Sequence, residues 1–478
     1  MTHETIITGG TVVDGTGSAP YRADVAIDGG KITRIGDLSA ESSGTTIDAS
    51  GKIVTPGFVD LHTHLDAQVG WDPEMKSSSY HGVTTALIGN CGVTFAPVSQ
   101  PNHRLLAELM EAVEDIEADA IMDGLPWNWK SYGEYLDAVD SLRPAINIVG
   151  LAGHSSIRFE AMGDKSMDEG VQATDAELSH ICRLVRESVE EGAVGFSTSR
   201  FLGHFVPDGR LTPGTWADLR ELNAIQAAIV EGGGAGGIFQ AAPDMASRRN
   251  VELEMIASGA QTGCHVLFSG GAGKKGDGGV AAMSEFLEQN NEGGRNVTAI
   301  CHTRPSGSMF GLLQATPFRN SPWKALMALP TLAERLAALR DPATKAALVK
   351  RSKETGFIAD PSQLHPMGVG QVPDYDMARK NSLQQIAEAE GRDPVDVYID
   401  RLITSEGREL WNYWAFGGSL ENQWAYMQMP NCIPMLGDAG AHVGLFTDSD
   451  SPTFLLSELT RRQGVYRLEE AVHRITQA

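Results

Sequence analysis

The stretch T-P-G-F-V-D-L-H-T-H-L-D, from Thr55 to Asp66, predicts both the start of the main fold and part of its site. An apolar run with strand character ends there in His62 and His64, one residue apart. Because side chains alternate along a strand, both imidazoles are expected to point to the same face. Two imidazoles on one face are a ready pair of metal ligands. Such a pair also arises by chance, so its context has to decide.

Downstream of this stretch, short buried strands alternate with helices, which is typical of βα repeats around a parallel sheet. Eight such units predict an α/β protein with a TIM barrel. The eight candidate strands are Ile53–Leu61, Val83–Gly89, Ala145–Val149, Ala193–Ser197, Gly236–Gln240, Gly263–Ser269, Asn296–His302 and Cys432–Asp438. Thr174 with Glu177 predicts a capping box at the start of one connecting helix, and Thr215 predicts the cap of the next.

Residues 1–52 precede the barrel and consist of short alternating strands split by glycine turns, with a tight hairpin at Asp28–Lys31. We therefore expect a small β-sandwich unit over 1–52 and a barrel domain over 53–478. The stretch 321–413 is mainly helical and too long for one βα loop. It is interpreted as an insertion between strands seven and eight that forms a lid.

The charge of the chain narrows its partners. With 38 basic and 61 acidic residues, the formal net charge is −23, which disfavours nucleic acid and anionic membranes. No apolar run is as long as a membrane span and the N-terminus lacks a signal-peptide pattern, so we expect a cytoplasmic protein with a small-molecule substrate. The five cysteines include no Cys-x-x-Cys pair, so neither a disulfide framework nor a zinc ribbon is indicated.

The acidic run from Glu108 to Asp123 is interpreted as a solvated helix face rather than a cation site. Its acids are interleaved with Leu, Met, Val and Ile, which is the pattern of an amphipathic helix.

The active site of a TIM barrel lies at the C-terminal ends of its strands, so the residues that follow each predicted strand can be compared. Strand one ends in His62 and His64, strand two runs into G-N-C-G with Cys91, and strand eight ends in G-D-A-G-A-H with Asp438. Alone, such a cysteine is more often a buried apolar residue, and such an aspartate a loop cap. Together they form a four-ligand set of the types that zinc prefers.

The order of four motifs resembles the amidohydrolase superfamily and, within it, the D-aminoacylase-like group of N-acyl-D-amino-acid deacylases. The motifs are P-G-F-V-D-L-H-T-H, H-G-V-T-T-A-L-I-G-N-C-G-V, G-H-S-S-I-R and G-D-A-G-A-H. The resemblance covers essentially the whole chain. It implies a metal-bearing barrel with a β-sandwich built from both chain ends. It also implies His62, His64, Cys91 and Asp438 as metal ligands, with Asp438 as general acid/base.

Two departures from the family pattern concern the metals. The family places histidines at the ends of strands five and six, where this sequence has Gln240 and Ser269, and the family's H-H-K run with its substrate-binding lysine is absent. We therefore expect one zinc ion rather than two, unless Gln240, His302 or another residue rebuilds a second site. Gln240 and Ser269 are candidates for such a site or for the substrate pocket.

A third departure lies at the C-terminus, where helical spacing continues from Leu468 through Ile475 in place of sandwich strands. We therefore expect a shortened chain with an exposed strand edge in residues 4–52, which favours a homo-oligomer.

Several further residues are candidates for contact with a substrate. His154, after strand three, and His302, at the end of strand seven, could polarise a carbonyl or equally be buried structural histidines. His442 is a candidate to orient Asp438 or bind substrate. Three arginines are candidates to anchor a substrate carboxylate, each against the alternative of a structural surface residue: Arg158, Arg200 and Arg304.

Three functions are compatible with these residues. The leading hypothesis is hydrolysis of an N-acyl amide by zinc-activated water, with Asp438 as general acid/base. A second keeps the barrel and the metal but opens a cyclic amide or lactone, or deaminates a heterocycle. A third is a non-catalytic binding protein on an amidohydrolase scaffold, which the two missing histidines motivate and the retained ligand set opposes.

Overall fold

The computed structural model describes residues 2–234, 236–273, 278–313, 315–369, 381–415, 419–446 and 448–478. Eight parallel strands form one sheet in the order β18-β14-β13-β12-β11-β10-β9-β8. They are β8 (Phe58–Asp60), β9 (Val83–Ile88), β10 (Asn147–Gly153), β11 (Gly195–Ser199), β12 (Ile238–Ala242), β13 (His265–Ser269), β14 (Asn296–Ile300) and β18 (Cys432–Ile433). All eight predicted strands are confirmed. The first is divided, because β7 (Ile53–Val54) pairs with a strand of another sheet.

Backbone hydrogen bonds join the first strand to the last just beyond their ends. The amide of Asp438 donates to the carbonyl of His62 at 2.9 Å, and the amide of His64 donates to the carbonyl of Ala439 at 2.7 Å. These bonds close the sheet, so the predicted TIM barrel is confirmed. They also hold the two histidines of strand one beside the aspartate of strand eight.

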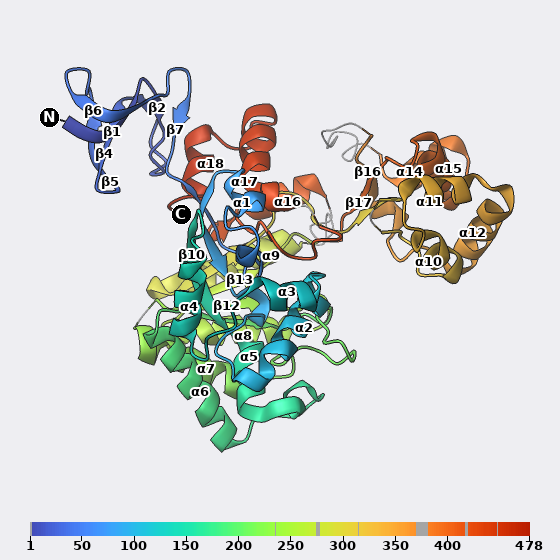
Figure 1. Ribbon diagram of the computed structural model, residues 1–478, viewed down its shortest axis with the longest axis horizontal. Coiled ribbons are helices and arrows are strands. Elements are labelled where there is room, and N and C mark those ends of the chain that lie inside the picture. Colours follow the sequence, from blue (N-terminus) through green and yellow to red (C-terminus); the bar gives the residue numbers. More distant parts are fainter. Residues whose placement is uncertain are drawn as a thin grey trace.

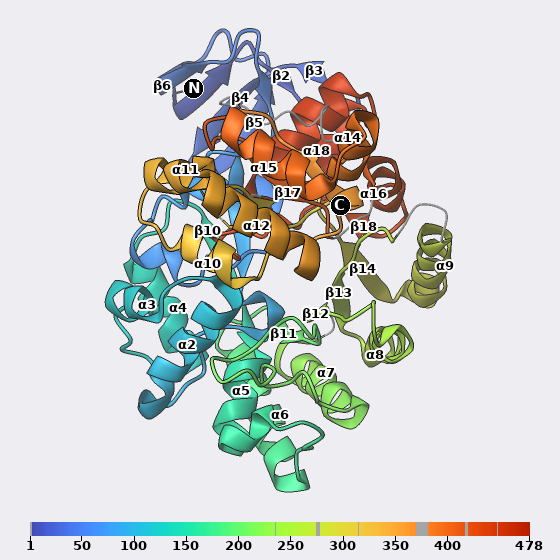
Figure 2. The same cartoon turned by 90° about the vertical axis from the view of Figure 1, so that its right-hand side faces the viewer.

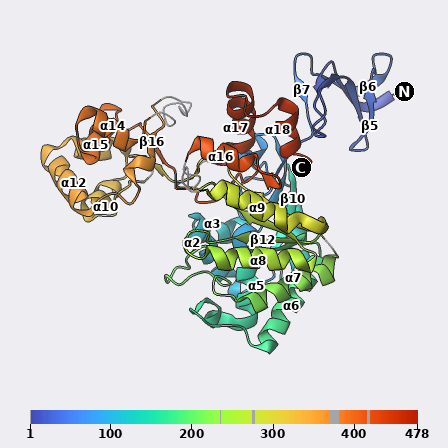
Figure 3. The same ribbon diagram turned by 180° about the vertical axis from the view of Figure 1, so that it is seen from behind.

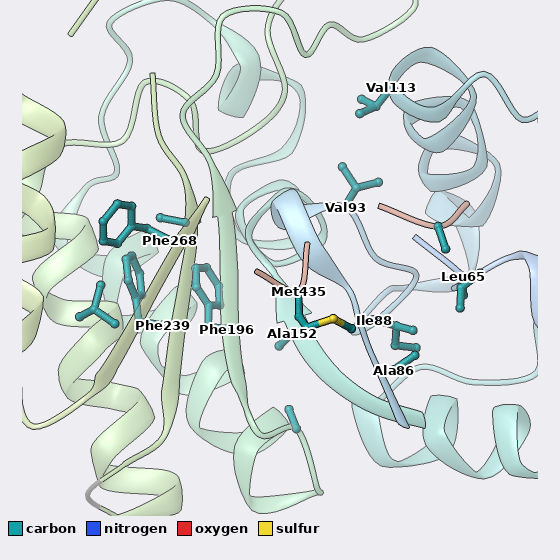
Figure 4. Close-up of a cluster of buried hydrophobic side chains, with 14 of the residues drawn as sticks. Leu65, Ala86, Ile88, Val93, Val113, Ala152, Phe196, Phe239, Phe268 and Met435 are labelled. Atoms are coloured by element: carbon teal, nitrogen blue, oxygen red, sulfur yellow. The ribbon is translucent and has the colours of Figure 1, made fainter. Parts of the chain in front are cut away.

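Apolar side chains fill the inside of the barrel, as the fold requires. The interior cluster comprises Leu87, Leu151, Leu267, Ile300 and Leu436, with Leu61, Val149, Val194, Ile238 and Ile433 packed against it. A larger cluster packs the outer face of the barrel against the helices. Figure 4 shows Phe196, Phe239 and Phe268 of this outer cluster side by side on neighbouring strands. The rings of Phe196 and Phe239 stack with their centroids 6.2 Å apart.

The alternation of side chains carries the interior face up to the mouth of the barrel, where it becomes polar. Gln240 follows Ile238 by two positions, Ser269 follows Leu267, His302 follows Ile300, and Asp438 follows Leu436. Because residues two apart share a face, these four polar side chains belong to the same interior surface as the apolar ones.

The connecting helices cover the outside of the barrel (Figure 2). They are α1 (Lys76–Ser79), α2 (His103–Glu114), α3 (Ala118–Gly124), α4 (Tyr132–Ser141), α5 (His154–Met162), α6 (Asp175–Glu190), α7 (Leu219–Gly233), α8 (Arg249–Thr262) and α9 (Gly279–Asn291), and after the insertion α16 (Leu420–Met427), α17 (Ser451–Phe454) and α18 (Leu468–Arg474). Among the described residues, no helix is both long and apolar enough to cross a bilayer.

One of the two predicted helix caps is correct. Thr174 and Glu177 form the capping box that begins α6. The cap predicted for α7 is wrong, because Asp218 rather than Thr215 accepts the bond that begins this helix. Thr215 is buried in the preceding turn, where its hydroxyl lies 3.2 Å from that of Thr212.

A helical lobe lies between β14 and β18, and Figures 1 and 3 show it standing to one side of the barrel. Its helices are α10 (Ser321–Met327), α11 (Leu332–Arg340), α12 (Pro342–Thr355), α14 (Leu383–Glu390) and α15 (Pro394–Thr404). The lobe has its own apolar core, which includes Trp323, Tyr398 and Trp411. A three-stranded sheet accompanies it, with β17 (Trp411–Tyr413) between β15 (Met309–Phe310) and β16 (Leu364–Pro366). Residues 370–380 of the predicted insertion lie outside the described residues.

Two small sheets form the N-terminal part. One has the order β5-β4-β1-β6 and the other β3-β2-β7. Their strands are β1 (Thr2–Thr8), β2 (Thr11–Val12), β3 (Tyr21–Arg22), β4 (Asp24–Asp28), β5 (Lys31–Gly36) and β6 (Ser42–Asp48). The hairpin predicted between β4 and β5 is confirmed, with Gly29 at φ +56° and Gly30 at φ +71°. Both loop residues of this turn need positive φ, which glycine adopts without strain.

Candidate metal centre

Donor atoms from three strands converge at the mouth of the barrel. The side chains of His62, His64 and Cys91 are buried, and their donor atoms all lie within 4.8 Å of one another. Sγ of Cys91 is 3.4 Å from Nε2 of His62. Oδ1 of Asp438 lies 3.7 Å from Nε2 of His62 and 3.4 Å from Nε2 of His64. The structure therefore brings together the four residues that the sequence predicts as metal ligands.

Three of the separations among these donors have the lengths expected around a tetrahedral metal ion. Zinc binds imidazole nitrogen and carboxylate oxygen at about 2.0–2.2 Å and thiolate at about 2.3 Å. The edge of a tetrahedron is about 1.6 times its radius, which corresponds to donor separations of roughly 3.3–3.8 Å. The separations of 3.4, 3.7 and 3.4 Å fall within this range. His62, His64 and Cys91 thus form a mutually close group of metal donors, Asp438 lies beside both imidazoles, and the four donor types are those that zinc prefers.

A tight turn after β9 presents the thiol of Cys91. Cys91 has φ +54° and lies between Gly89 at φ +76° and Gly92 at φ +71°. A non-glycine residue rarely adopts this conformation, and such strain clusters at functional sites. The amide of Cys91 donates to Oε1 of Gln240 at 3.3 Å, and that of Gly92 donates to Oγ of Ser197 at 2.9 Å. The turn is therefore held by residues on two other strands.

Asp438 is held in a similar way. It has φ +52°, again in the left-handed region. The buried carboxylate of Asp60 accepts hydrogen bonds from the amides of His62 and Gly437, both at 3.1 Å. Because one carboxylate binds the backbone of both segments, the histidine of strand one and the aspartate of strand eight are fixed relative to each other.

Burial and charge set the protonation states of the four side chains. Burial lowers the pKa of His62 to about 3, so this imidazole is neutral, which is the form that binds metal. Burial also disfavours protonation of His64, but the charge of Glu114 and contacts with Asp438 and Cys91 raise its pKa well above the ordinary value. Burial raises the pKa of the Cys91 thiol. Burial would raise the pKa of Asp438 as well, but the hydrogen bond and the charge of His64 hold it well below its ordinary value.

Glu114 is a site residue that the sequence analysis missed. It ends α2 and is 1% exposed, and its Oε1 lies 3.0 Å from Nδ1 of His64. The interpretation of the acidic run as a solvated face is therefore wrong at this position. A signal was present in the helical spacing, because Glu114 follows the buried residues Ala107 and Met110 at intervals of seven and four.

His204, in the loop after β11, was also missed. It is buried, and its Nδ1 lies 2.8 Å from Oγ of Ser199. Burial lowers its pKa to about 3, and its ring lies at the same mouth as that of His442, with the two centroids 6.3 Å apart. One histidine in a glycine-rich loop carries no pattern by which the sequence could have identified it.

Gln240 and Ser269 both contact residues of the predicted metal site. Gln240 accepts a hydrogen bond from the amide of Cys91, and Oγ of Ser269 lies 3.4 Å from Nδ1 of His62. Each therefore supports one member of the four-residue group.

His302 and His442 lie at the same mouth. The side chain of His302 is 13% exposed, and its Nδ1 lies 4.0 Å from Oδ2 of Asp448. His302 thus lies where a substrate could reach it. Nδ1 of His442 lies 3.8 Å from Oδ2 of Asp115.

Of the two roles left open for His154, the structure supports that of a buried structural histidine and contradicts the catalytic one. Its side chain is fully buried, with Nδ1 2.8 Å from Oγ1 of Thr198 and Nε2 2.8 Å from Oε1 of Glu221. Both ring nitrogens are engaged in the interior, so the ring cannot polarise a substrate carbonyl.

The predicted carboxylate anchors are wrong for the same reason. Arg158 is fully buried and donates to Glu221 at 2.9 Å. Arg200 is 4% exposed and donates to the backbone carbonyls of Thr215 and Ala217, in the turn that precedes α7. Arg304 is 5% exposed and pairs with Asp448 at 3.2 Å. These arginines are interior residues with partners, rather than anchors or surface residues.

Comparison with known proteins places this geometry in context. Residues 45–351 match the amidohydrolase family. N-acyl-D-glutamate deacylase of Alcaligenes xylosoxydans xylosoxydans is 33% identical over 273 residues, which cover 55% of this chain and 49% of that protein. D-aminoacylase of the same organism is 33% identical over 207 residues, which cover 43% and 39%. An uncharacterised protein of Mycobacterium tuberculosis is 33% identical over 273 residues, which cover 54% and 43%. The chain thus spans about half the length, or less, of these relatives.

Solved structures share the fold over nearly the whole chain. N-acyl-D-glutamate deacylase from Bordetella bronchiseptica, complexed with zinc and a phosphonate mimic of the tetrahedral intermediate, aligns with a TM-score of 0.64 and 24% identity. A structure of D-aminoacylase that addresses the role of its binuclear metal centre aligns with a TM-score of 0.65 and 22% identity. Both alignments cover 99% of this chain and 84% of the other.

Proposed function

Because the chain belongs to the amidohydrolase family, we propose that it is a metal-dependent hydrolase of carbon–nitrogen bonds other than peptide bonds, with N-acyl-D-amino acids as its substrate class. The observation that carries the proposal is the group of buried donors His62, His64 and Cys91 at the barrel mouth, with the partly exposed Asp438 beside both imidazoles. Two relatives named for deacylation of N-acyl-D-amino acids support the substrate class.

The proposed centre holds one zinc ion. Gln240 and Ser269 stand at the strand ends that would have to supply ligands for a second ion. Oε1 of Gln240 accepts the amide of Cys91, and Oγ of Ser269 faces Nδ1 of His62. Both oxygens therefore support the first site. In this arrangement Cys91 would bind the single ion only. Gln240 and Ser269, which stand where the family has histidines, would support the ligands of that ion.

A bound zinc ion supplies a Lewis acid that activates water at neutral pH and polarises a carbonyl. Asp438 is the residue placed to move the proton. Its carboxylate is ionised at neutral pH, and its left-handed backbone aims Oδ1 at both imidazoles. It takes the proton from the attacking water and passes it to the leaving nitrogen.

Two further histidines have proposed roles towards the carbonyl oxygen. His302 is partly exposed at the mouth and can donate to the oxyanion. Ser199 holds Nδ1 of His204, which leaves Nε2 as the nitrogen of that ring that can contact substrate.

A neutral cyclic amide or lactone is the second candidate substrate. The observation that favours it is the engagement of Arg158, Arg200 and Arg304 with interior partners, since each was a candidate to bind a substrate carboxylate. The barrel and the proposed metal site would be unchanged in this case.

Turnover by the zinc-loaded protein tests the proposal. The substrate panel comprises N-acyl-D-glutamate, N-acyl derivatives of neutral D-amino acids, cyclic imides and lactones, with release of product as the signal. We expect Asp438→Asn to lower kcat by about 10²–10⁴-fold while most zinc is retained by His62, His64 and Cys91, because the amide oxygen can still coordinate weakly but the amide cannot take the proton. Asp140→Asn, on the exposed face of α4, is the matched control. Near-normal turnover by Asp438→Asn would sink the proposed role, and zinc binding without turnover of any substrate would favour a binding protein.

The domain division is also proposed, with a β unit over 1–52, a barrel domain over 53–478 and a helical insertion over 321–413. Cytoplasmic location and a homo-oligomeric state stay predictions from the sequence.

A further inference from the structure

A carboxylate buried at the end of α2 is the starting point. Glu114 is 1% exposed, whereas Glu108 on the same helix is 38% exposed and pairs with Arg104 at the surface. Burying a carboxylate costs free energy unless charged or hydrogen-bonding partners compensate. The partners of Glu114 therefore explain why the helix directs this side chain inward.

Glu114 divides its two oxygens between two segments of the barrel mouth. Oε1 lies 3.0 Å from Nδ1 of His64, the second histidine of strand one. Oε2 accepts a hydrogen bond from the amide of His442 at 3.3 Å. The backbone carbonyl of Glu114 also accepts from the amide of Val443 at 3.2 Å. One residue from the loop after strand two thus contacts segments that follow strands one and eight.

The contact with His64 determines which nitrogen can bind a metal. The negative charge of the carboxylate, 3.0 Å from Nδ1 and without hydrogen-bond geometry, favours the proton on that nitrogen, which leaves the lone pair of Nε2 unprotonated. Nε2 is the nitrogen that faces the other donors, 3.4 Å from Oδ1 of Asp438. A carboxylate in this position also makes the imidazole a more basic ligand.

Glu114 also contacts the loop that follows strand eight, whose backbone is strained. Asp438 and His442 both have positive φ, +52° and +42°. Such backbone is costly and persists only where its surroundings impose it. The two hydrogen bonds that the amides of His442 and Val443 donate to Glu114 are part of those surroundings. They lie four and five residues beyond the proposed ligand Asp438.

We propose that Glu114 is a positioning residue that orients His64 towards the metal and holds the strand-eight loop in place, so that its loss weakens metal binding. The inference rests on the proposed function in one respect, namely that a metal ion occupies this site.

Glu114→Gln is the variant that tests it. Glutamine keeps the size of the side chain but removes the negative charge 3.0 Å from Nδ1 of His64, while its one oxygen can still accept from the amide of His442. We expect zinc affinity, measured by competition with a chelator, to fall by about 10- to 100-fold. Glu108→Gln makes the same change on the exposed face of α2 and should leave the affinity within twofold. Unfolding of the metal-free proteins by urea shows whether either change acts through the fold alone.

A second readout follows the ligands directly. In the cobalt-substituted protein, the visible absorption bands should shift in Glu114→Gln and not in Glu108→Gln, because reorientation of His64 alters the ligand field. If Glu114→Gln does not fold, nitrogen chemical shifts of zinc-loaded wild type decide the question. Nδ1 of His64 protonated and Nε2 on the metal supports the inference, and the opposite tautomer overturns it.

The outcomes separate this inference from the proposed function. Zinc affinity of Glu114→Gln within twofold of wild type overturns the inference, whatever the protein hydrolyses. Zinc binding that depends on Glu114 in a protein that hydrolyses none of the substrates supports the inference and overturns the function. A wild-type protein that binds no zinc overturns both.

Discussion

The interior network around Glu221 allows a quantitative test of the structural role of His154. Glu221 is 1% exposed, and its Oε1 accepts from Nε2 of His154 at 2.8 Å and from Nε of Arg158 at 2.9 Å. Burial would raise the pKa of Glu221, but the hydrogen bond of His154 and the charges of His154 and Arg158 lower it below its ordinary value. Glu221 is therefore the counter-charge of a guanidinium that is itself fully buried.

Glu221→Gln removes this charge and keeps the shape of the side chain. Breaking a buried ion pair by removing one partner costs about 3–5 kcal/mol, because the other charge is left uncompensated. This corresponds to roughly a 150- to 5,000-fold change in the folding equilibrium. Urea unfolding followed by far-ultraviolet circular dichroism measures the loss. Zinc content should stay near wild type, because the network contains none of the four proposed ligands.

The control for this variant is Glu187→Gln on α6. Glu187 is 46% exposed and pairs with Arg183 at 3.0 Å, one helical turn away. Such an exposed pair contributes only about 0.3–0.5 kcal/mol. A loss below about 1 kcal/mol for Glu221→Gln would refute the reasoning, since a buried ion pair should cost more than that. A His154→Gln variant with unchanged stability and no turnover would also refute it, because His154 would then act in catalysis rather than in the fold.

Two further predictions concern the N-terminal sheet and the strand-eight loop. Hydrogen bonds to Asp28 at 2.7 Å and Glu41 at 2.6 Å raise the pKa of His3 above its ordinary value of 6.5. Its stabilising contribution should therefore be full below pH 6.5 and lost as the pH rises through the raised value. Hydrogen exchange of β1 amides across this range should show the loss in wild type, and His3→Gln should flatten it. Gly440 has φ +86°, and an added Cβ would lie 2.4 Å from the carbonyl oxygen of His64. We expect Gly440→Ala to weaken zinc binding at least about tenfold in chelator competition, because the loop must shift; unchanged affinity would contradict this.

Local signals account for the parts of the fold that the sequence predicts correctly. Each barrel strand is a short apolar run, and the capping box of Thr174 and Glu177 involves residues three positions apart. The start of α7 was placed wrongly because Thr215 and Asp218 are both suitable caps. Burial of Thr215 in a turn, which depends on distant residues, decided between them.

The site shows the same difference between local sequence signals and contacts between distant residues. His62, His64, Cys91 and Asp438 could be predicted because each follows a strand, and the ends of parallel strands meet at one mouth. The role of His154 stayed open between catalysis and structure because its partner Glu221 lies 67 residues away and no local pattern reveals it. The helical stripe that includes Glu114 was present in the sequence, but the interpretation weighed the acidity of the segment rather than the position of each acid on the helix.

The central claim is that one metal ion is held by two histidines, a cysteine and an aspartate. Metal analysis with X-ray absorption at the zinc edge tests it most directly in the purified chain. The account predicts one equivalent of zinc, with one sulfur ligand at about 2.3 Å and three nitrogen or oxygen ligands at about 2.0–2.2 Å. Two equivalents with a metal–metal scatterer, or a spectrum without sulfur, would contradict it.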